Sequence, residues 1–180
     1  MLLQLATTLT RPLPLRLDIT HGLSGSGKST VTQTLMQTPG AIRLRSDVER
    51  KRLAGLDALA RSDSGVGQKL YEADTTRRLY AQLARLAGEL LVAGWPVIVD
   101  ATCLARWQRD LLREQARSRS VTFRILDFPV APDILRERIV QRARAGNDAS
   151  EANLDVLQHQ IETEDPLGPD EQADIASSDS

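Results

Sequence analysis

Several side chains in this sequence could act together in the transfer of a phosphate group. Lys28 could neutralise phosphate oxygens, and Ser29 and Asp100 could hold a metal ion. Asp47 could accept the proton of an attacking hydroxyl, and arginines such as Arg138 could stabilise charge that develops on the transferred group. These residues are far apart in the chain, so the fold must bring them together.

The most specific motif is a glycine, four free positions and then Gly-Lys-Ser, starting at Gly22. Its glycines allow a tight turn that aims backbone N–H groups inward, and the following helix adds its positive N-terminal end. Lys28 can reach the β and γ phosphates of a nucleotide, and the Ser29 hydroxyl can hold the Mg²⁺ that bridges them. The residues expected to bind the nucleotide are Gly22, Ser24, Gly25, Ser26, Gly27, Lys28, Ser29 and Thr30.

Strand and helix patterns alternate on both sides of this loop. Strands are expected at 15–20, 42–45, 96–100 and 121–126, separated by helices that include a leucine stripe at Leu79, Leu83, Leu86 and Leu90. The alternation predicts a three-layer α/β fold with a parallel sheet of four to five strands and right-handed crossovers. Asp18 interrupts the first strand, although a central parallel strand is usually apolar on both faces.

Local signals also predict how individual helices begin and pack. Val31 and Leu35 lie one turn apart and predict the apolar side of the helix that Lys28 opens. Ser46 and Glu49 have the spacing of a capping box at the start of the next helix. Glycines interrupt 53–68, which is consistent with a loop over the active cleft.

Two aspartates follow or end predicted strands, at the sheet edge where ligands gather in open α/β folds. Asp47 could act as general base, or it could cap a helix, although Ser46 offers a better cap. Asp100 could hold Mg²⁺ or a metal-bound water beside Ser29, or it could form a structural hydrogen bond to the glycine-rich loop.

Two groups of basic residues could contact phosphates. Arg138 and Arg142 share a helix face before a flexible glycine, as in a lid that closes on a nucleotide; the alternative is a solvated basic face paired with Glu137. Arg50 and its basic neighbours 51–52 could bind an anionic acceptor or could form an exposed helix turn.

Length and composition indicate one ordinary domain without a membrane segment. The chain has 180 residues and a net charge of −1, which does not favour a long nucleic acid or an anionic membrane. The single cysteine, Cys103, excludes an internal disulfide and favours a cytoplasmic location. We expect a leader or linker at 1–14, one folded domain at 15–166 and a disordered tail at 167–180.

The motifs at 22–30, 44–52, 99–102 and 148–152 together resemble the P-loop kinases of the AAA_33 or zeta-toxin type, which are related to polynucleotide 5'-hydroxyl kinases and gluconate kinases. This resemblance implies ATP as the donor, Asp47 as the acceptor-activating aspartate and Arg50 as an acceptor-side arginine. It implies that Arg138 and Arg142 are the lid arginines. It also implies fusion or association with an aminoglycoside-phosphotransferase-like domain.

Two functions follow as hypotheses. The first is an ATP-dependent kinase that phosphorylates a hydroxyl of a small molecule or of a nucleic-acid 5' end, with Asp47 as general base. The alternative is an ATP-binding and hydrolysing switch that regulates a partner without phosphorylating an acceptor.

Overall fold

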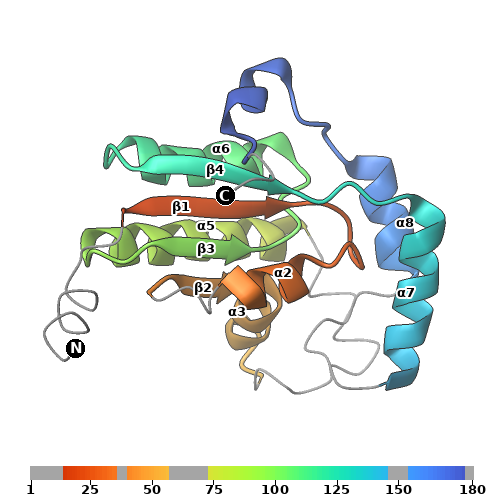
Figure 1. The fold of residues 1–180 in the computed structure, drawn as a ribbon. Helices are drawn as coiled ribbons and strands as arrows, with labels where there is room; N and C mark the ends of the chain where they lie inside the picture. Colours follow the sequence, from red (N-terminus) through yellow and green to blue (C-terminus); the bar gives the residue numbers. More distant parts are fainter. Residues whose placement is uncertain (1–13, 36–39, 57–72, 146–153, 177–180) are drawn as a thin grey trace, which may run out of the picture.

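The computed structural model describes residues 14–35, 40–56, 73–145 and 154–176, which form an α/β fold around one four-stranded parallel sheet (Figure 1). The strands are β1 (Arg16–His21), β2 (Ile42–Arg45), β3 (Val97–Asp100) and β4 (Thr122–Asp127). The helices are α2 (Lys28–Leu35), α3 (Ser46–Leu53), α5 (Ala73–Val92), α6 (Arg106–Arg117), α7 (Pro132–Ala145), α8 (Leu154–Thr163) and the short 3₁₀ helix η1 (Pro169–Asp174). The strand order β2-β3-β1-β4 places β1, which leads into the glycine-rich loop, between β3 and β4. The predicted fold class and strand positions are confirmed.

One side of the sheet carries the main apolar core and is covered by α5 and α6 (Figure 1). Leu44, Val99, Ile19 and Ile125 form a row across the four strands because the strands pair in register. Val99, Ile19 and Ile125 have no exposed surface, and Leu44 packs against them. This row gives α5 and α6 a continuous apolar surface to cover.

The leucine stripe on α5 contributes to the same core, as predicted. Leu79 and Leu83 are fully buried, whereas Leu86 and Leu90 are half-buried at the edge of the helix face. The chain leaves α5 at Gly94, which has a φ of 86° and therefore accepts the left-handed conformation that ends a helix. No helix in the described ranges combines the length and the apolarity needed to cross a membrane.

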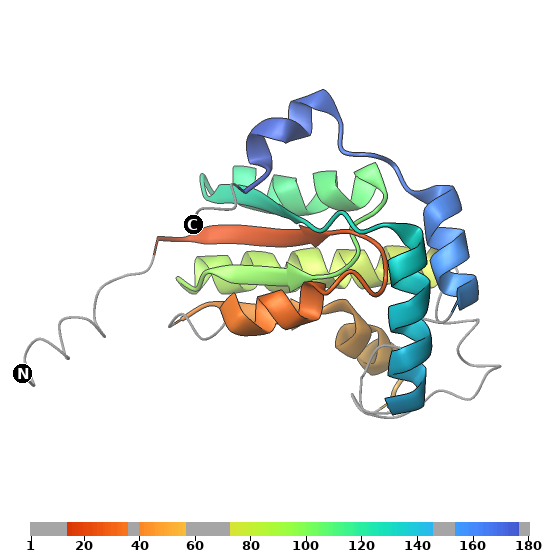
Figure 2. The same cartoon turned by 45° about the vertical axis from the view of Figure 1, so that its right-hand side comes forward.

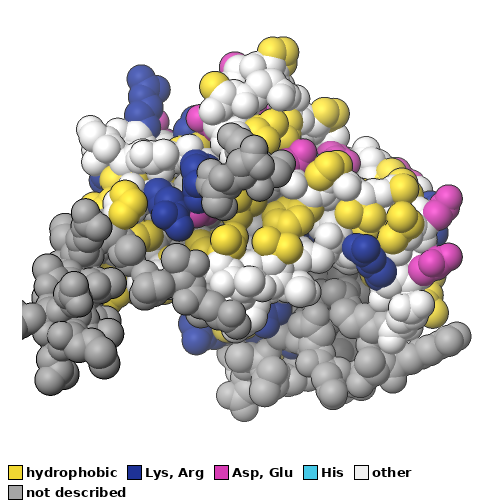
Figure 3. Space-filling model, viewed as in Figure 1, with side chains coloured by type: hydrophobic (Ala, Val, Ile, Leu, Met, Phe, Trp, Pro, Cys, Tyr) yellow, Lys and Arg dark blue, Asp and Glu magenta, His cyan; other side chains and the backbone are white. Residues whose placement is uncertain are grey.

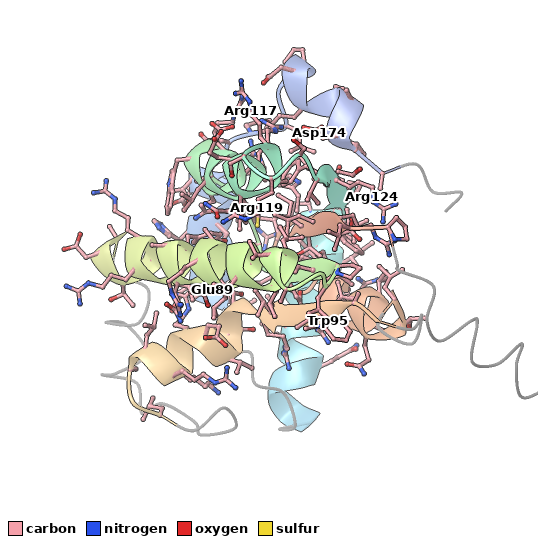
Figure 4. The ribbon with its side chains drawn as sticks, turned by 90° about the vertical axis from the view of Figure 1, so that its left-hand side faces the viewer. Glu89, Trp95, Arg117, Arg119, Arg124 and Asp174 are labelled. Carbon is pink, nitrogen blue, oxygen red and sulfur yellow. The ribbon has the colours of Figure 1, made fainter. Side chains whose placement is uncertain are left out.

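The other side of the sheet carries charged side chains, which explains Asp18 in the first strand. Register places Asp18 beside Arg124 of β4, and the two side chains form two hydrogen bonds of 2.8 and 3.0 Å. Arg16 donates a third, at 3.0 Å, so the buried carboxylate is well paired. Arg124 lies toward the amino ends of the strands, the end of the molecule that faces the viewer in Figure 4. A sheet apolar on both faces was therefore the wrong expectation, because ion pairs satisfy the charges on this face.

Helix α2 packs on the charged face, and its predicted apolar side is wrong. Val31 is 43% exposed, while the buried residues of the helix are Lys28 and Thr32. The Thr32 hydroxyl donates to the Lys28 carbonyl oxygen at 2.9 Å, which satisfies it in the interior. Two apolar residues at helical spacing were too weak a signal, because the sheet face beneath α2 is itself polar.

The start of α3 also differs from the prediction. Ser46 is the first helical residue, Arg45 occupies the N-cap position, and no side chain caps the helix there. Glu49 instead accepts a hydrogen bond of 2.5 Å from Arg52 one turn later. The predicted capping box is therefore wrong, because β2 runs directly into α3 and leaves no turn in which Ser46 could cap.

The segment after α8 is folded along α6, contrary to the tail expected from residue 167, as far as residue 176. Arg109 of α6 and Glu171 of η1 have fully buried side chains and are joined by hydrogen bonds of 2.7 and 3.0 Å. Arg106 pairs with Asp170 on the exposed flank of this contact. Burial alone would raise the pKa of Glu171, but hydrogen bonds from Arg109 and from the Gly168 N–H outweigh it and hold that pKa below its ordinary value.

The C-terminal segment also touches the outer edge of the sheet. Ile175 forms a single parallel bridge with Ile125, and the Ala176 N–H donates to the Ile125 carbonyl oxygen at 2.9 Å. Within the described residues the expected fifth strand is limited to this bridge.

The buried pair predicts an asymmetric response to mutation. Arg109→Met should lower the free energy of unfolding by about 3–5 kcal/mol, because it leaves the Glu171 carboxylate buried without its counter-ion. The double variant Arg109→Met/Glu171→Leu should recover most of that loss. Urea unfolding at neutral pH measures both, and the exposed Arg106→Gln is the control with a much smaller effect. Equal losses in the single and double variants would contradict this interpretation.

Candidate functional site

The glycine-rich loop connects the carboxyl end of β1, a central strand of the sheet, to the start of α2. The Gly22 N–H donates to the Thr102 carbonyl oxygen at 3.1 Å, which fixes the loop to the chain beyond β3. Gly22 has a φ of 141°, and a Cβ atom there would approach the Phe128 carbonyl oxygen to 2.9 Å. Both the conformation and the space at the start of the loop therefore require glycine.

The Lys28 side chain lies inside this loop and is buried. Its ammonium donates to the carbonyl oxygens of Gly22 at 2.8 Å and Leu23 at 2.7 Å, and to the Ser26 hydroxyl at 3.2 Å. These bonds hold a positive charge at the centre of the loop. A phosphate that enters the loop would meet this cation together with the N-terminal end of α2.

Asp100 and Ser29 meet as the sequence predicted. The Ser29 hydroxyl donates to Asp100 Oδ2 at 3.0 Å, which joins the first turn of α2 to the end of β3. Both oxygens are hard ligands of the kind that Mg²⁺ prefers. The described residues contain no cluster of three or more His, Cys, Asp or Glu suited to a metal ion. Ser29 and Asp100 thus fit a Mg²⁺ that takes most of its ligands from phosphates and water.

Arg43 is a site residue that the sequence reasoning missed. It lies on β2, and its guanidinium donates to Asp100 Oδ2 through Nε at 3.0 Å and through Nη2. It also donates to the Ser29 carbonyl oxygen at 3.2 Å and to Gln33 of α2 at 3.0 Å. The available signal was the alternation of β2, which places Arg43 on the side of the sheet opposite to Leu44.

Asp47 and Arg50 lie on α3, which begins directly after β2. Register pairs Arg45, the last residue of β2, with Asp100. Asp47 follows Arg45 by two residues and therefore begins close to the same end of the sheet. Asp47 is half-buried, and so is Arg50 one turn along the helix. The structure thus brings both residues to the same edge of the sheet as the glycine-rich loop.

Helices α7 and α8 stand beside the loop at the carboxyl end of the sheet (Figure 2). Leu23 of the loop packs against Leu135 and Leu157, which belong to a second, smaller apolar cluster. Arg138 of α7 donates to the Gly25 carbonyl oxygen at 3.3 Å, and the Ser24 N–H donates to Gln160 of α8 at 2.9 Å. These helices therefore touch the loop directly, as expected of a lid.

Some predicted residues lie only in part within the described structure. Arg142 is on α7, one turn beyond Arg138, but its side chain lies outside the described residues. The loop predicted over the cleft at 53–68 is described only up to residue 56, and the motif at 148–152 falls outside the described ranges.

Cys103 follows β3 close to the site but does not behave as a nucleophile. Its side chain is fully buried, and burial raises the pKa of the thiol to about 12. The Cys103 N–H donates to the Tyr80 hydroxyl at 3.1 Å, which anchors the chain beyond β3 to α5. A packing role fits this environment.

Residues 17–167 match the AAA_33 family model, which is described as an AAA domain. Uncharacterized proteins of Mycobacterium tuberculosis and Mycobacterium bovis are 29% identical to this chain over 139 residues. The match covers 75% of this chain but 27% of theirs, so the chain spans about a quarter of the length of these relatives.

Solved structures with a similar fold include several kinases. A gluconokinase from Sinorhizobium meliloti is 24% identical with a TM-score of 0.59, and the match covers 92% of this chain and 82% of that one. A sugar kinase from Janibacter sp. is 21% identical with a TM-score of 0.64, covering 88% and 82%. Chaetomium thermophilum Kti12, solved with ADP-AlF3, is 17% identical with a TM-score of 0.63, covering 91% and 89%. These likenesses confirm the predicted fold of P-loop kinases.

The conformation of Gly22 leads to a test of the loop. Gly22→Ala should weaken binding of ATP about tenfold, because the new Cβ must displace Phe128 and the loop start with it. Gly94→Ala is the matched control: its φ of 86° is also left-handed, but nothing lies within 4 Å of the added atom. Both variants should lose about 1–3 kcal/mol of stability, whereas only Gly22→Ala should lose affinity in calorimetric titration. Equal affinities would show that the start of the loop tolerates a side chain.

Proposed function

The chain belongs to the AAA_33 family, and we propose on this basis that it is an ATP-dependent kinase that transfers the γ-phosphate to a hydroxyl group. The acceptor is a small molecule or a nucleic-acid 5' end. The observation that carries the proposal is the pairing of Arg45 with Asp100, which puts Asp47 and the Ser29–Asp100 contact at one sheet edge.

The donor side of the site is formed by the loop. Backbone N–H groups where the loop runs into the first turn of α2, together with the Lys28 ammonium, bind the β and γ phosphates of ATP. Ser29 would ligate Mg²⁺, and Asp100 would hold the same ion directly or through a bound water. A bound ion would supply positive charge that offsets the negative charge of the phosphates.

On the acceptor side, Asp47 orients the acceptor hydroxyl and removes its proton as the hydroxyl oxygen bonds to the γ-phosphorus. The bond from that phosphorus to the β,γ-bridging oxygen breaks in the same step, and ADP leaves. A carboxylate suits this role because its charged form accepts hydrogen bonds and donates none. It therefore binds the O–H group of the acceptor, whose proton it can then remove. Arg50, on the next turn of α3, binds the acceptor beside it. The half-buried position of Asp47 supports this role, because the residue is partly withdrawn from solvent and an acceptor can still reach it.

Arginines of α7 stabilise the transferred group. Arg138 already contacts the loop through Gly25, so a small movement of α7 brings its guanidinium to the γ-phosphate. Arg142, one turn further along α7, is the second arginine in this role. Guanidinium groups suit the task because their donors match two phosphate oxygens at once.

The wider context is also part of the proposal. A cytoplasmic location agrees with the use of ATP and with the buried free thiol of Cys103. An aminoglycoside-phosphotransferase-like domain as a fused or associated partner agrees with the greater length of the mycobacterial relatives. The net charge of −1 and the aromatic content of 3% favour a small or terminal acceptor over a long nucleic acid. On the face shown in Figure 3, the coloured Lys and Arg side chains lie at separate spots.

The base is tested by Asp47→Asn. This variant should lower the rate of phosphoryl transfer about 100-fold or more and change ATP affinity little, because the amide cannot accept the proton. Glu89→Gln is the control, since it makes the same carboxylate-to-amide change on the exposed part of α5 (Figure 4). Transfer at the parental rate in Asp47→Asn would exclude Asp47 as the base.

The acceptor class is tested with labelled ATP. The panel contains oligonucleotides with 5'-hydroxyls, nucleosides, sugars and aminoglycosides, and a labelled product identifies the acceptor class. ATP hydrolysis with no labelled product across the panel, together with ATP-dependent binding of a partner, would favour the regulatory switch instead.

A further inference from the structure

Arg43 is held more firmly than a surface arginine would be. Its side chain is 6% exposed, and its donors reach Asp100 of β3, the Ser29 carbonyl oxygen and Gln33 of α2. These contacts fix the guanidinium between the sheet and the helix that starts at the glycine-rich loop. The guanidinium therefore has one defined position, next to the carboxylate assigned to the metal site.

Asp100 needs a counter-ion in this position. Its side chain is 4% exposed, and a carboxylate withdrawn from water is destabilised by several kcal/mol unless charges and hydrogen bonds compensate. The Ser29 hydroxyl supplies one hydrogen bond but no charge. Arg43 supplies both, through two donors on Oδ2.

Arg45 does not provide the same compensation. Its Nε is 3.9 Å from Asp100 Oδ2, beyond hydrogen-bond distance, and its side chain is 27% exposed. Solvent screens a charge at that position more strongly than the charge of Arg43. Of the two arginines that form ion pairs with Asp100 in the described part of the chain, Arg43 is therefore the one that compensates the carboxylate more strongly.

We propose that Arg43 is the internal counter-ion of the metal site: it keeps Asp100 aligned with Ser29 when no divalent cation is bound, and it opposes the cation electrostatically when one binds. The proposal rests on the proposed function, because it takes the site to bind nucleotide with Mg²⁺. Arg43 is thus a positioning residue that sets how strongly Mg²⁺ and the nucleotide enhance each other's binding.

The coupling between metal and nucleotide provides the measurement. The probe is AMPPNP, an ATP analogue that is not hydrolysed, and its Kd is measured with a chelator and again with saturating Mg²⁺. The Kd with chelator divided by the Kd with saturating Mg²⁺ gives a ratio, and this ratio reports how much Mg²⁺ strengthens nucleotide binding. No acceptor is needed, so the result does not depend on whether phosphoryl transfer is found.

Arg43→Gln should raise this ratio about tenfold over the parent, because the variant leaves Asp100 without a counter-ion until Mg²⁺ arrives. Its Tm in the presence of chelator should also fall by several degrees and recover in part when Mg²⁺ and AMPPNP are added together. Arg85→Gln, which removes one arginine charge from an exposed pair on α5, should keep the parental ratio. An unchanged or lower ratio in Arg43→Gln would overturn the proposal.

Two further variants decide the matter if Arg43→Gln does not fold. Arg43→Lys keeps the charge and should hold the ratio within about threefold of the parent, since one cation still opposes the metal. Arg43→Gln/Asp100→Asn removes both charges and should fold, because no buried carboxylate is then left without its counter-ion. A tenfold rise in Arg43→Lys, or failure of the double variant to fold, would show that Arg43 acts through packing and not as a counter-ion.

Discussion

The buried Asp100 carboxylate is the constraint on which this site depends. A charge at the end of β3 is stable there only because Arg43 and Ser29 meet it, and these partners come from β2 and from α2. Their contacts fix the helix that follows the glycine-rich loop against the sheet. The hydrogen bonds and the ion pair of Asp100 therefore help to set the distance between the loop and the carboxyl ends of β2 and β3, together with apolar packing.

One face of the sheet carries the apolar core, and the other carries charged residues that include those of the candidate site. The face toward α5 and α6 holds the apolar rows that drive folding. The face toward α2 holds two ion pairs, Asp18 with Arg124 and Asp100 with Arg43. Arg43 lies level with Asp18 in the strand register, whereas Asp100 lies at the carboxyl end of β3. Residues on the second face can thus differ in charge with little effect on the main core, provided that each buried charge keeps its partner.

The sequence was sufficient for the order of strands and helices, the parallel sheet and the loop around Lys28, because periodicity and glycine spacing are local signals. The meeting of Ser29 with Asp100 followed from the rule that strand ends gather at one edge. Arg43 and Arg109 could not be found in this way. A buried arginine depends on a carboxylate 57 or 62 residues away, and no local pattern records that partner. The role of Asp47 stays a prediction.

The ion pairs between α6 and η1 extend the packed unit beyond the segment that matches the family model. The family match stops at residue 167, yet Glu171, four residues later, neutralises Arg109 at the centre of α6. Arg113 of the same helix forms a partly exposed ion pair with Asp174, which Figure 4 labels. The packed unit in the described residues is thus larger than the segment that matches the family model. A chain shortened to residue 167 would lose the acidic partners of Arg109 and Arg113 in η1.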